Sequence, residues 1–143
     1  MIRENFMRSV LAGFIATYVM TMTGFWQAGI GLPKIDVGAM LAANMGHTYA
    51  WGQLAHFING IILALIYAKW LYKVLPGHRV VKGIIYGIIT TIAAGLVVVP
   101  LASPAGVFFT RTPNPAIMII GSLVIHLAYG FTLGVVYCPF NKD

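Results

Sequence analysis

His-Phe-Ile-Asn-Gly-Ile-Ile-Leu-Ala-Leu-Ile-Tyr, residues 56–67, decides the fold of this chain, because a related stretch returns seventy residues later. The second stretch, residues 126–137, reads His-Leu-Ala-Tyr-Gly-Phe-Thr-Leu-Gly-Val-Val-Tyr. Both follow the pattern His-x3-Gly-x2-Leu-x3-Tyr. The shared positions are spaced so that they lie on one face of an α-helix. The sequence therefore predicts two helices that carry the same stripe of side chains.

The composition around these stretches is that of a membrane protein. Charged residues make up 8% of the 143 residues and apolar residues 59%, whereas a soluble domain carries about 25% charged residues. Four stretches contain no Asp, Glu, Lys or Arg: residues 9–33, 37–68, 83–110 and 112–141. Each is longer than the roughly 20 residues that a helix needs to cross a bilayer. We expect one integral membrane domain over residues 1–143.

Glycine and proline residues divide the chain into four expected transmembrane helices, at residues 9–30, 49–72, 80–99 and 115–137. The turn at residues 76–79 is short, so the second and third helices are expected to be antiparallel neighbours. Asp36 is expected to cap the N-terminus of a short helix over residues 37–45 at the outer membrane face. Asn114 followed by Pro115 is typical of a helix start.

The basic residues predict the orientation in the membrane. Seven of them fall on the side of the two termini: Arg3, Arg8, Lys69, Lys73, Arg79, Lys82 and Lys142. Only Lys34 and Arg111 fall on the other side. Since basic loops stay in the cytoplasm, we expect an inner (cytoplasmic) membrane protein with both termini cytoplasmic. The net charge of +6 does not indicate a nucleic-acid partner, because the charges end apolar runs instead of forming a patch; the expected partners are the lipid bilayer and other integral membrane subunits.

The repeat extends beyond the two stripes. Residues 8–68 align with residues 78–138 without a gap, and each copy contains two helices, so both enter the membrane in the same direction. This predicts an all-α bundle of two parallel-repeat helical hairpins about a pseudo-two-fold axis along the membrane normal. Glycines that let helices approach closely are predicted at the helix contacts: Gly13, Gly60, Gly83, Gly87, Gly130 and Gly134.

The two repeated histidines are the leading candidate site residues. The alignment places His56 and His126 at equal depth in the outer half of the bilayer, and an ionisable residue within a span suggests a function. Two imidazoles could ligate a b-type haem or a metal ion. Alternatively, each could hydrogen-bond a backbone carbonyl, a Thr or a Tyr and fix helix packing, or contact a substrate.

Other candidate ligands are weaker. Asp36 could join His47 or His56 in a metal site at the outer face instead of serving only as a cap. Four methionines offer thioether sulfur to copper, Met20, Met22, Met40 and Met45, although methionine in apolar helices more often fills space. The sequence has no P-loop, HExxH, GxSxG or paired-carboxylate motif, so we expect no enzymatic activity.

Short motifs across the chain form a recognisable set. The first half carries Gly31-Leu-Pro-Lys-Ile-Asp-Val-Gly-Ala-Met-Leu41, His56-Phe-Ile-Asn-Gly60 and Ile66-Tyr-Ala68. The second half carries Pro100-Leu101, Gly106-Val-Phe108, His126, Tyr129-Gly130, Leu133-Gly134 and Tyr137. Over residues 8–138 the chain resembles a family of small four-helix prokaryotic membrane proteins of unknown function. This resemblance implies a four-helix bundle with no assigned activity, and it favours a role beside membrane oxidase systems.

Three functions are open at this point. The first is a non-catalytic accessory or structural subunit of a larger respiratory or oxidase-type membrane complex. The second is an electron-transfer subunit that binds haem or a metal ion through His56 and His126. The third is a channel or carrier formed by an oligomer.

Overall fold

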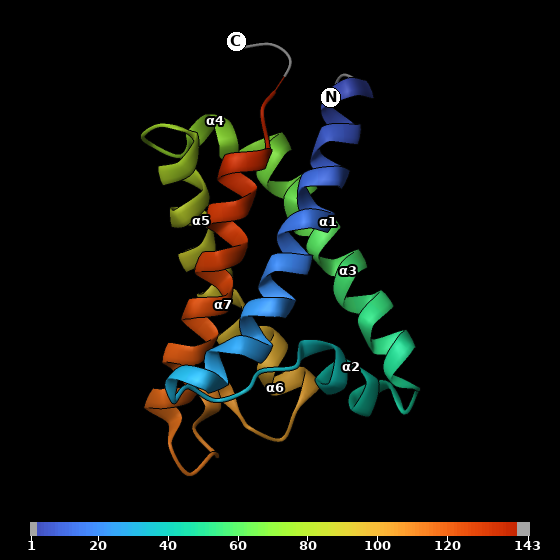
Figure 1. Cartoon of the computed structure of the whole chain (residues 1–143), viewed down its shortest axis with the longest axis vertical. Coiled ribbons are helices and arrows are strands. Elements are labelled where there is room, and N and C mark those ends of the chain that lie inside the picture. The colour runs from blue at the N-terminus through green and yellow to red at the C-terminus, as the bar shows by residue number, and fades with distance from the viewer. Residues whose placement is uncertain (1–2, 140–143) are drawn as a thin grey trace.

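The computed structural model describes residues 3–139, which form an all-helical bundle without strands (Figure 1). Its first and last long helices are α1 (Arg3–Trp26), extended by the 3-10 turn η1 (Gln27–Ile30), and α7 (Pro115–Val136). Between them, α3 (Tyr49–Ile66) continues through the π-helical η2 (Tyr67–Leu71) into α4 (Tyr72–Val74). In the same way, α5 (Arg79–Ala93) continues through the π-helical η3 (Ala94–Val98) into α6 (Val99–Ala102).

Four of these helical segments are long and apolar enough to cross a membrane, which confirms the predicted fold class. The short helix α2 (Val37–Met45) has the predicted bounds. The backbone N–H of Ala39 donates to the Asp36 carboxylate at 2.9 Å, and Gly46 ends α2 in the left-handed conformation that glycine adopts without strain. A second 3-10 turn, η4 (Val107–Phe109), lies in the loop before α7.

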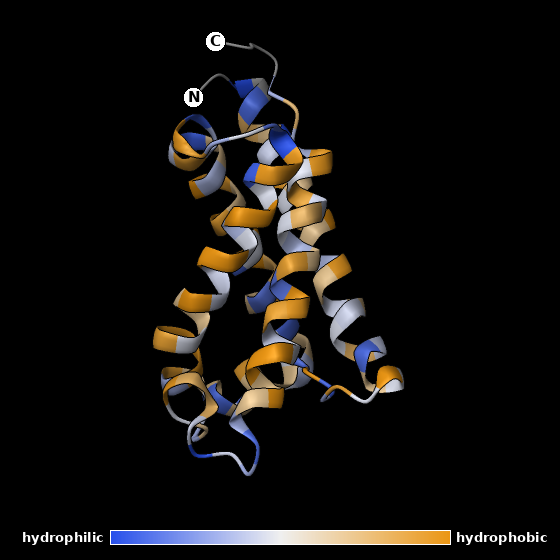
Figure 2. Ribbon diagram, turned by 90° about the vertical axis from the view of Figure 1, so that its left-hand side faces the viewer, coloured by the Kyte–Doolittle hydropathy of each residue, from blue (hydrophilic) through white to orange (hydrophobic). Residues whose placement is uncertain are grey.

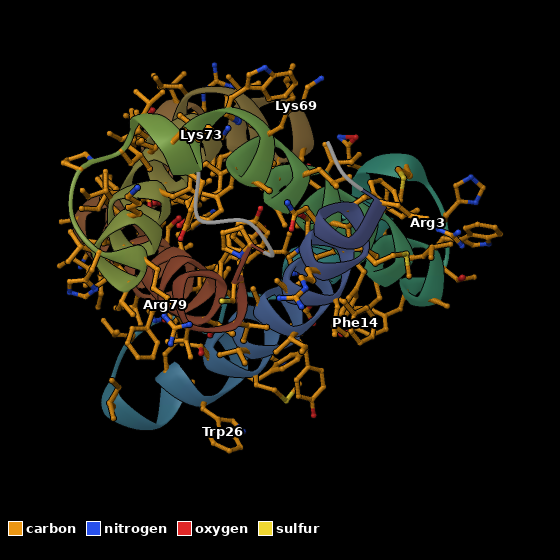
Figure 3. All side chains as sticks on the ribbon, turned by 90° about the horizontal axis from the view of Figure 1, so that it is seen from above. Arg3, Phe14, Trp26, Lys69, Lys73 and Arg79 are labelled. Carbon is orange, nitrogen blue, oxygen red and sulfur yellow. The ribbon has the colours of Figure 1, made fainter. Side chains whose placement is uncertain are left out.

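The surface and the ends of the bundle match a membrane setting. Apolar residues dominate the long helices (Figure 2), and Phe14 and Trp26 point outward from α1 (Figure 3). Seen from the end where α1 begins, Lys69, Lys73 and Arg79 lie on the side of the bundle formed by α4 and the start of α5 (Figure 3). Lys142 lies outside the described residues. Four apolar helices therefore indicate a multi-pass membrane protein.

The helices pack as two hairpins joined through α1 and α7. The helix α1 packs against α3, α5 packs against α7, and α1 and α7 join the two pairs, while α2 covers α3. The fourth possible seam is missing, because α3 slants away from α5 (Figure 1) and the two make no extensive backbone contact within residues 3–139. The expectation that the second and third helices are neighbours holds only near their connecting turn.

Small residues form the contact within the first hairpin. A Cβ atom added to Gly13 would lie 2.7 Å from the Cβ of Ala64 and 2.9 Å from the Cα of Ile61. The side chain of Thr17 lies directly against Gly60. Both contacts join α1 to α3, so a larger residue at either glycine would push these helices apart.

The second hairpin repeats this contact at the positions shifted by seventy residues. A Cβ atom on Gly83 would lie 2.8 Å from the Cα of Gly134, and one on Gly130 would lie 2.9 Å from the Cα of Gly87. The two GxxxG motifs thus face each other across α5 and α7, as such motifs do in closely packed membrane helices. Where the second hairpin has Gly87 and Gly134, the first has Thr17 and Ala64, so side-chain atoms take part in the contact between α1 and α3.

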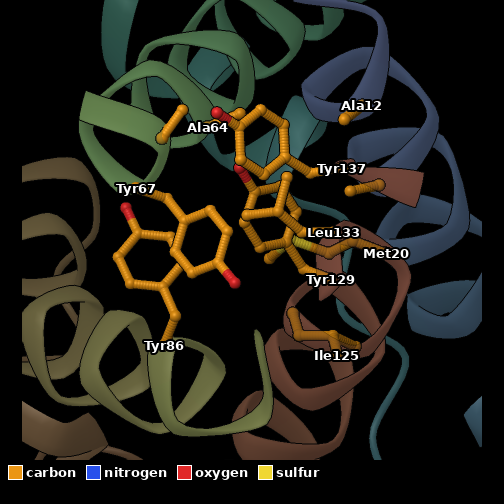
Figure 4. Close-up of a cluster of buried hydrophobic side chains, with 11 residues drawn as sticks. Ala12, Met20, Ala64, Tyr67, Tyr86, Ile125, Tyr129, Leu133 and Tyr137 are labelled. Atoms are coloured by element: carbon orange, nitrogen blue, oxygen red, sulfur yellow. The ribbon is translucent and has the colours of Figure 1, made fainter. Parts of the chain in front are cut away.

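Tyrosines fill the half of the bundle nearest the termini. Tyr67, Tyr86, Tyr129 and Tyr137 are buried together with Leu133 (Figure 4). The Tyr67 and Tyr86 rings lie 5.0 Å apart between centroids, a normal distance for paired aromatic side chains. These two rings fill the space between α5 and the segment that follows α3. Farther from the termini, the space between α3 and α5 contains a cavity.

Candidate functional site

A cavity of about 130 Å³ lies among α1, α2, α3, α5 and α7, in the half of the bundle away from the termini. Both histidines that the sequence singles out line it. The hairpin arrangement explains this convergence, because the repeat gives α3 and α7 the same direction and the same stripe. His56 and His126 therefore lie in the wall of the same cavity.

His56 on α3 is buried without a hydrogen-bond partner. Its side chain is 3% exposed, and neither ring nitrogen has a partner among residues 3–139. The nearest aromatic ring is that of Phe57, edge-on at 6.1 Å between centroids. A buried polar group without a partner carries a desolvation cost. His56 therefore offers both a hydrogen-bond donor and an acceptor to whatever occupies the cavity.

His126 on α7 is held by its own helix. Its Nδ1 lies 2.7 Å from the carbonyl oxygen of Ser122, one helical turn earlier, and 3.4 Å from the Ser122 hydroxyl. Because a carbonyl can only accept, Nδ1 must carry the proton. In an uncharged imidazole this leaves the lone pair on Nε2. The Thr and Tyr residues suggested as partners from the sequence instead bond to backbone carbonyls.

Three hydroxyl groups in the cavity wall donate their protons to the backbone, whereas the Ser122 hydroxyl, whose contact is the protonated Nδ1 of His126, keeps its proton. Thr17 donates to the Gly13 carbonyl at 2.7 Å, and Thr90 donates to the Gly87 carbonyl at 3.0 Å. The Tyr129 hydroxyl crosses from α7 to the Gly60 carbonyl on α3 at 2.6 Å. The remaining lone pairs of these oxygens can only accept hydrogen bonds.

We place the mouth of the cavity between α3 and α5, because its exposed lining residues lie there. Two of its lining residues are exposed on the outside of the bundle, Asn59 on α3 and Ala93 on α5. They flank the seam that lacks extensive backbone contact. If the helices span a membrane, this mouth faces lipid, not water.

The end of the cavity farthest from the termini is closed by α2 and by the loop before α7. The side chain of Asn44 on α2 donates to the Leu101 carbonyl on α6 at 2.9 Å. Phe109 lines the cavity, and both Phe108 and Phe109 adopt positive φ angles, 46° and 58°. Such angles cost about 1–3 kcal/mol in residues other than glycine. The wall is therefore built at some cost in backbone strain.

Metal-ligating groups are sparse at this site. Met20 and Met40 line the cavity with the two histidines, whereas Met45 lines a separate apolar groove on α3. No group of three or more His, Cys, Asp or Glu side chains occurs in the described residues. Asp36 caps α2 and also lies 3.5 Å from the Tyr49 hydroxyl. The cavity thus offers two imidazoles and two thioethers, without a carboxylate or thiolate.

Several residues of the cavity wall were not predicted from the sequence. Ser122 precedes His126 by one helical turn, a spacing that signals contact. Thr17 and Thr90 have no such signal, because hydroxyl residues are common in these helices and nothing marks which ones border a cavity. Phe109 enters the wall only through an unusual backbone conformation.

Comparison with known proteins identifies the chain only at the level of a family. No curated protein and no solved structure matches it. One family model matches residues 3–143, nearly the whole chain, and its description is that of a family of unknown function. With its four apolar helices and its histidine-lined cavity, this chain belongs to the family of unknown function DUF6789.

Proposed function

We propose that this protein is a non-catalytic membrane protein that binds a small, membrane-soluble molecule in the cavity between α3 and α5. One observation carries the proposal: a buried histidine without a partner, His56, lines a cavity that opens through the seam between two spans. A molecule dissolved in the bilayer could reach the histidines through this seam without crossing water.

The size of the cavity supports a ligand. Unfilled space costs about 24 cal/mol per Å³ in a protein core, so 130 Å³ would cost on the order of 3 kcal/mol. Binding is a better explanation of such a volume than loose packing. A cavity of about 150 Å³ in a soluble protein takes up one benzene molecule, so the volume fits a single ring. A haem macrocycle is much larger, and it would require the helices to move apart.

The accessory-subunit prediction loses part of its support. Helix faces of small residues could also dock against another membrane protein. The six glycines that the sequence places at helix contacts meet other parts of the same chain, so they are not available to such a partner. Ligand binding is thus the function that the geometry supports best, and membership of a larger complex remains a prediction, as does an oligomeric channel or carrier.

The test blocks the mouth of the cavity. The protein, purified in mild detergent, is denatured and extracted with organic solvent, and the extract is measured by mass spectrometry. Ala93→Trp places a large side chain at the mouth, while Ile92→Trp adds the same bulk at a neighbouring exposed residue that does not line the cavity. We expect one compound in near-stoichiometric amount from the wild type and from Ile92→Trp, and at least tenfold less from Ala93→Trp. Equal extracts from all three proteins would refute the proposal.

A further inference from the structure

The cavity wall has more acceptors than donors, and this imbalance restricts the chemistry of its ligand. The hydroxyl protons of Thr17, Thr90 and Tyr129 are bound to carbonyls, and the Nδ1 proton of His126 is bound to Ser122. Inside the cavity, His56 and the Ser122 hydroxyl are the buried groups with a proton left to donate. A ligand that carries only acceptors would leave Nε2 of His126 without a partner.

We infer that the ligand is a hydroxyl-bearing ring, of the phenol or hydroquinone class, whose O–H donates to Nε2 of His126. A second oxygen, or the same one, accepts from the ring N–H of His56. This inference rests on the proposed function. It adds the chemical class of the ligand, which follows from the direction of the hydrogen bonds in the wall.

The rest of the wall suits a flat, apolar ring. Ile35, Val37, Ile125 and Phe109 provide apolar surface around the polar groups. The volume of about 130 Å³ is close to that of a cavity that holds one six-membered ring. An apolar tail on the ring would leave through the mouth between Asn59 and Ala93 into the bilayer.

A cation would also suit a wall rich in acceptors, but the path by which it would have to enter the cavity argues against it. The exposed lining residues lie between two apolar helices, and moving a charge through hydrocarbon is costly. A neutral hydroxyl compound meets the same acceptors without that cost. The phenol class therefore accounts for both the wall and its mouth.

The experiment compares ligands that differ by one proton. Protein in lipid nanodiscs is titrated with 4-hexylphenol, 4-hexylanisole and 2-hexyl-1,4-benzoquinone, and binding to empty nanodiscs is subtracted. The anisole keeps the ring and the tail but lacks the donor, and the quinone carries only acceptors. Because an unmade hydrogen bond to a buried group is costly, we expect the phenol to bind about tenfold more tightly than either of the others.

Variants separate the hydrogen bond from general packing. His126→Phe is expected to weaken phenol binding about tenfold and to leave anisole binding unchanged. His47→Phe replaces an exposed histidine that does not line this cavity, so it should match the wild type. Helical circular dichroism and a single size-exclusion peak establish that each variant is folded.

Four outcomes would overturn the inference. The first is equal affinity of the wild type for the phenol and the anisole, and the second is a phenol preference that survives in His126→Phe. The third is a stoichiometric metal ion in the purified protein that is lost in Met20→Leu, which would assign the cavity to a metal. In the fourth, no probe binds although the extracted compound still depends on Ala93; the phenol class then fails and the proposed function stands.

Discussion

At the scale of single residues, the contact between α5 and α7 is made by glycines packed backbone to backbone. Gly83 meets backbone atoms of both Gly130 and Gly134. Backbone atoms, unlike the end of a flexible side chain, cannot turn aside. A methyl group at this position therefore forces the two helices apart along the whole hairpin.

We predict that Gly83→Ala destabilises the protein by about 1–3 kcal/mol, the usual cost of overpacking a close contact. Unfolding by SDS, followed by circular dichroism, measures the change. The matched control is Gly29→Ala in η1, where a Cβ atom would have nothing within 4 Å, so its stability should equal that of the wild type. Equal stability of the two variants would show that the α5–α7 contact is not as close as described.

At the scale of elements, two tyrosine hydroxyls link α3 to α5 and α7, the two helices against which its backbone does not pack closely. Tyr86 on α5 donates to the Leu63 carbonyl at 2.8 Å, and Tyr129 on α7 donates to the Gly60 carbonyl at 2.6 Å. Both acceptors lie on the last turns of α3 before its backbone changes to the π-helical η2. Side chains that bond to helix carbonyls often accompany such irregularities.

Tyr86→Phe should loosen α3 without unfolding the protein. The ring stays, so only one hydrogen bond is lost, at a cost of about 1 kcal/mol. Spin labels at the exposed positions Ile62 and Ile88 are expected to show a broader distance distribution in this variant. Tyr18→Phe removes a hydroxyl from an exposed tyrosine and should leave the distribution unchanged, whereas an unchanged distribution in Tyr86→Phe would contradict this role.

The positions of the helices along the chain were predictable from the sequence, whereas the distances between packed helices were not. Uncharged runs ended by Gly and Pro located all four spans, and Asp36 located the start of α2. The first helix begins six residues earlier than expected, at Arg3 instead of residue 9, since polar residues at a membrane surface continue a helix as readily as apolar ones. The open seam between α3 and α5 has no counterpart in the hydropathy pattern, which is the same for spans that pack together and spans that do not.

The candidate site was likewise predictable only in part. The repeat singled out His56 and His126, and both line the cavity. The cavity lies where α3 slants away from α5. A sequence pattern indicates which residues make contact, but it does not indicate where packed helices leave space between them. Hydroxyl groups of the cavity wall donate to backbone carbonyls. Every residue type has this carbonyl, so the sequence does not indicate which donors are already bound.

At the scale of the whole molecule, the basic residues at the end where α1 begins predict the orientation in the membrane. Arg3, Lys69, Lys73 and Arg79 gather there (Figure 3), and Lys82 donates to the Tyr72 carbonyl at 2.6 Å across the turn. Basic residues near the ends of spans are retained in the cytoplasm. We therefore expect this end of the molecule to be cytoplasmic.

Reporter fusions at the C-terminus test the orientation. Green fluorescent protein fluoresces when it folds in the cytoplasm, and alkaline phosphatase is active only outside it. We expect a fluorescent first fusion and an inactive second one. A matched pair of fusions within the loop at residues 103–106 should give the opposite result, and phosphatase activity at the C-terminus would reverse the assignment.

The equivalence of the two hairpins has a consequence for how the protein meets its neighbours. In a symmetric duplication, the seam between α1 and α7 and the seam between α5 and α3 would be alike, and the molecule would have two entrances. Here the first seam is packed and only the second is open. The protein is therefore asymmetric within the plane of the membrane, and the proposed ligand would enter and leave on the α3–α5 side.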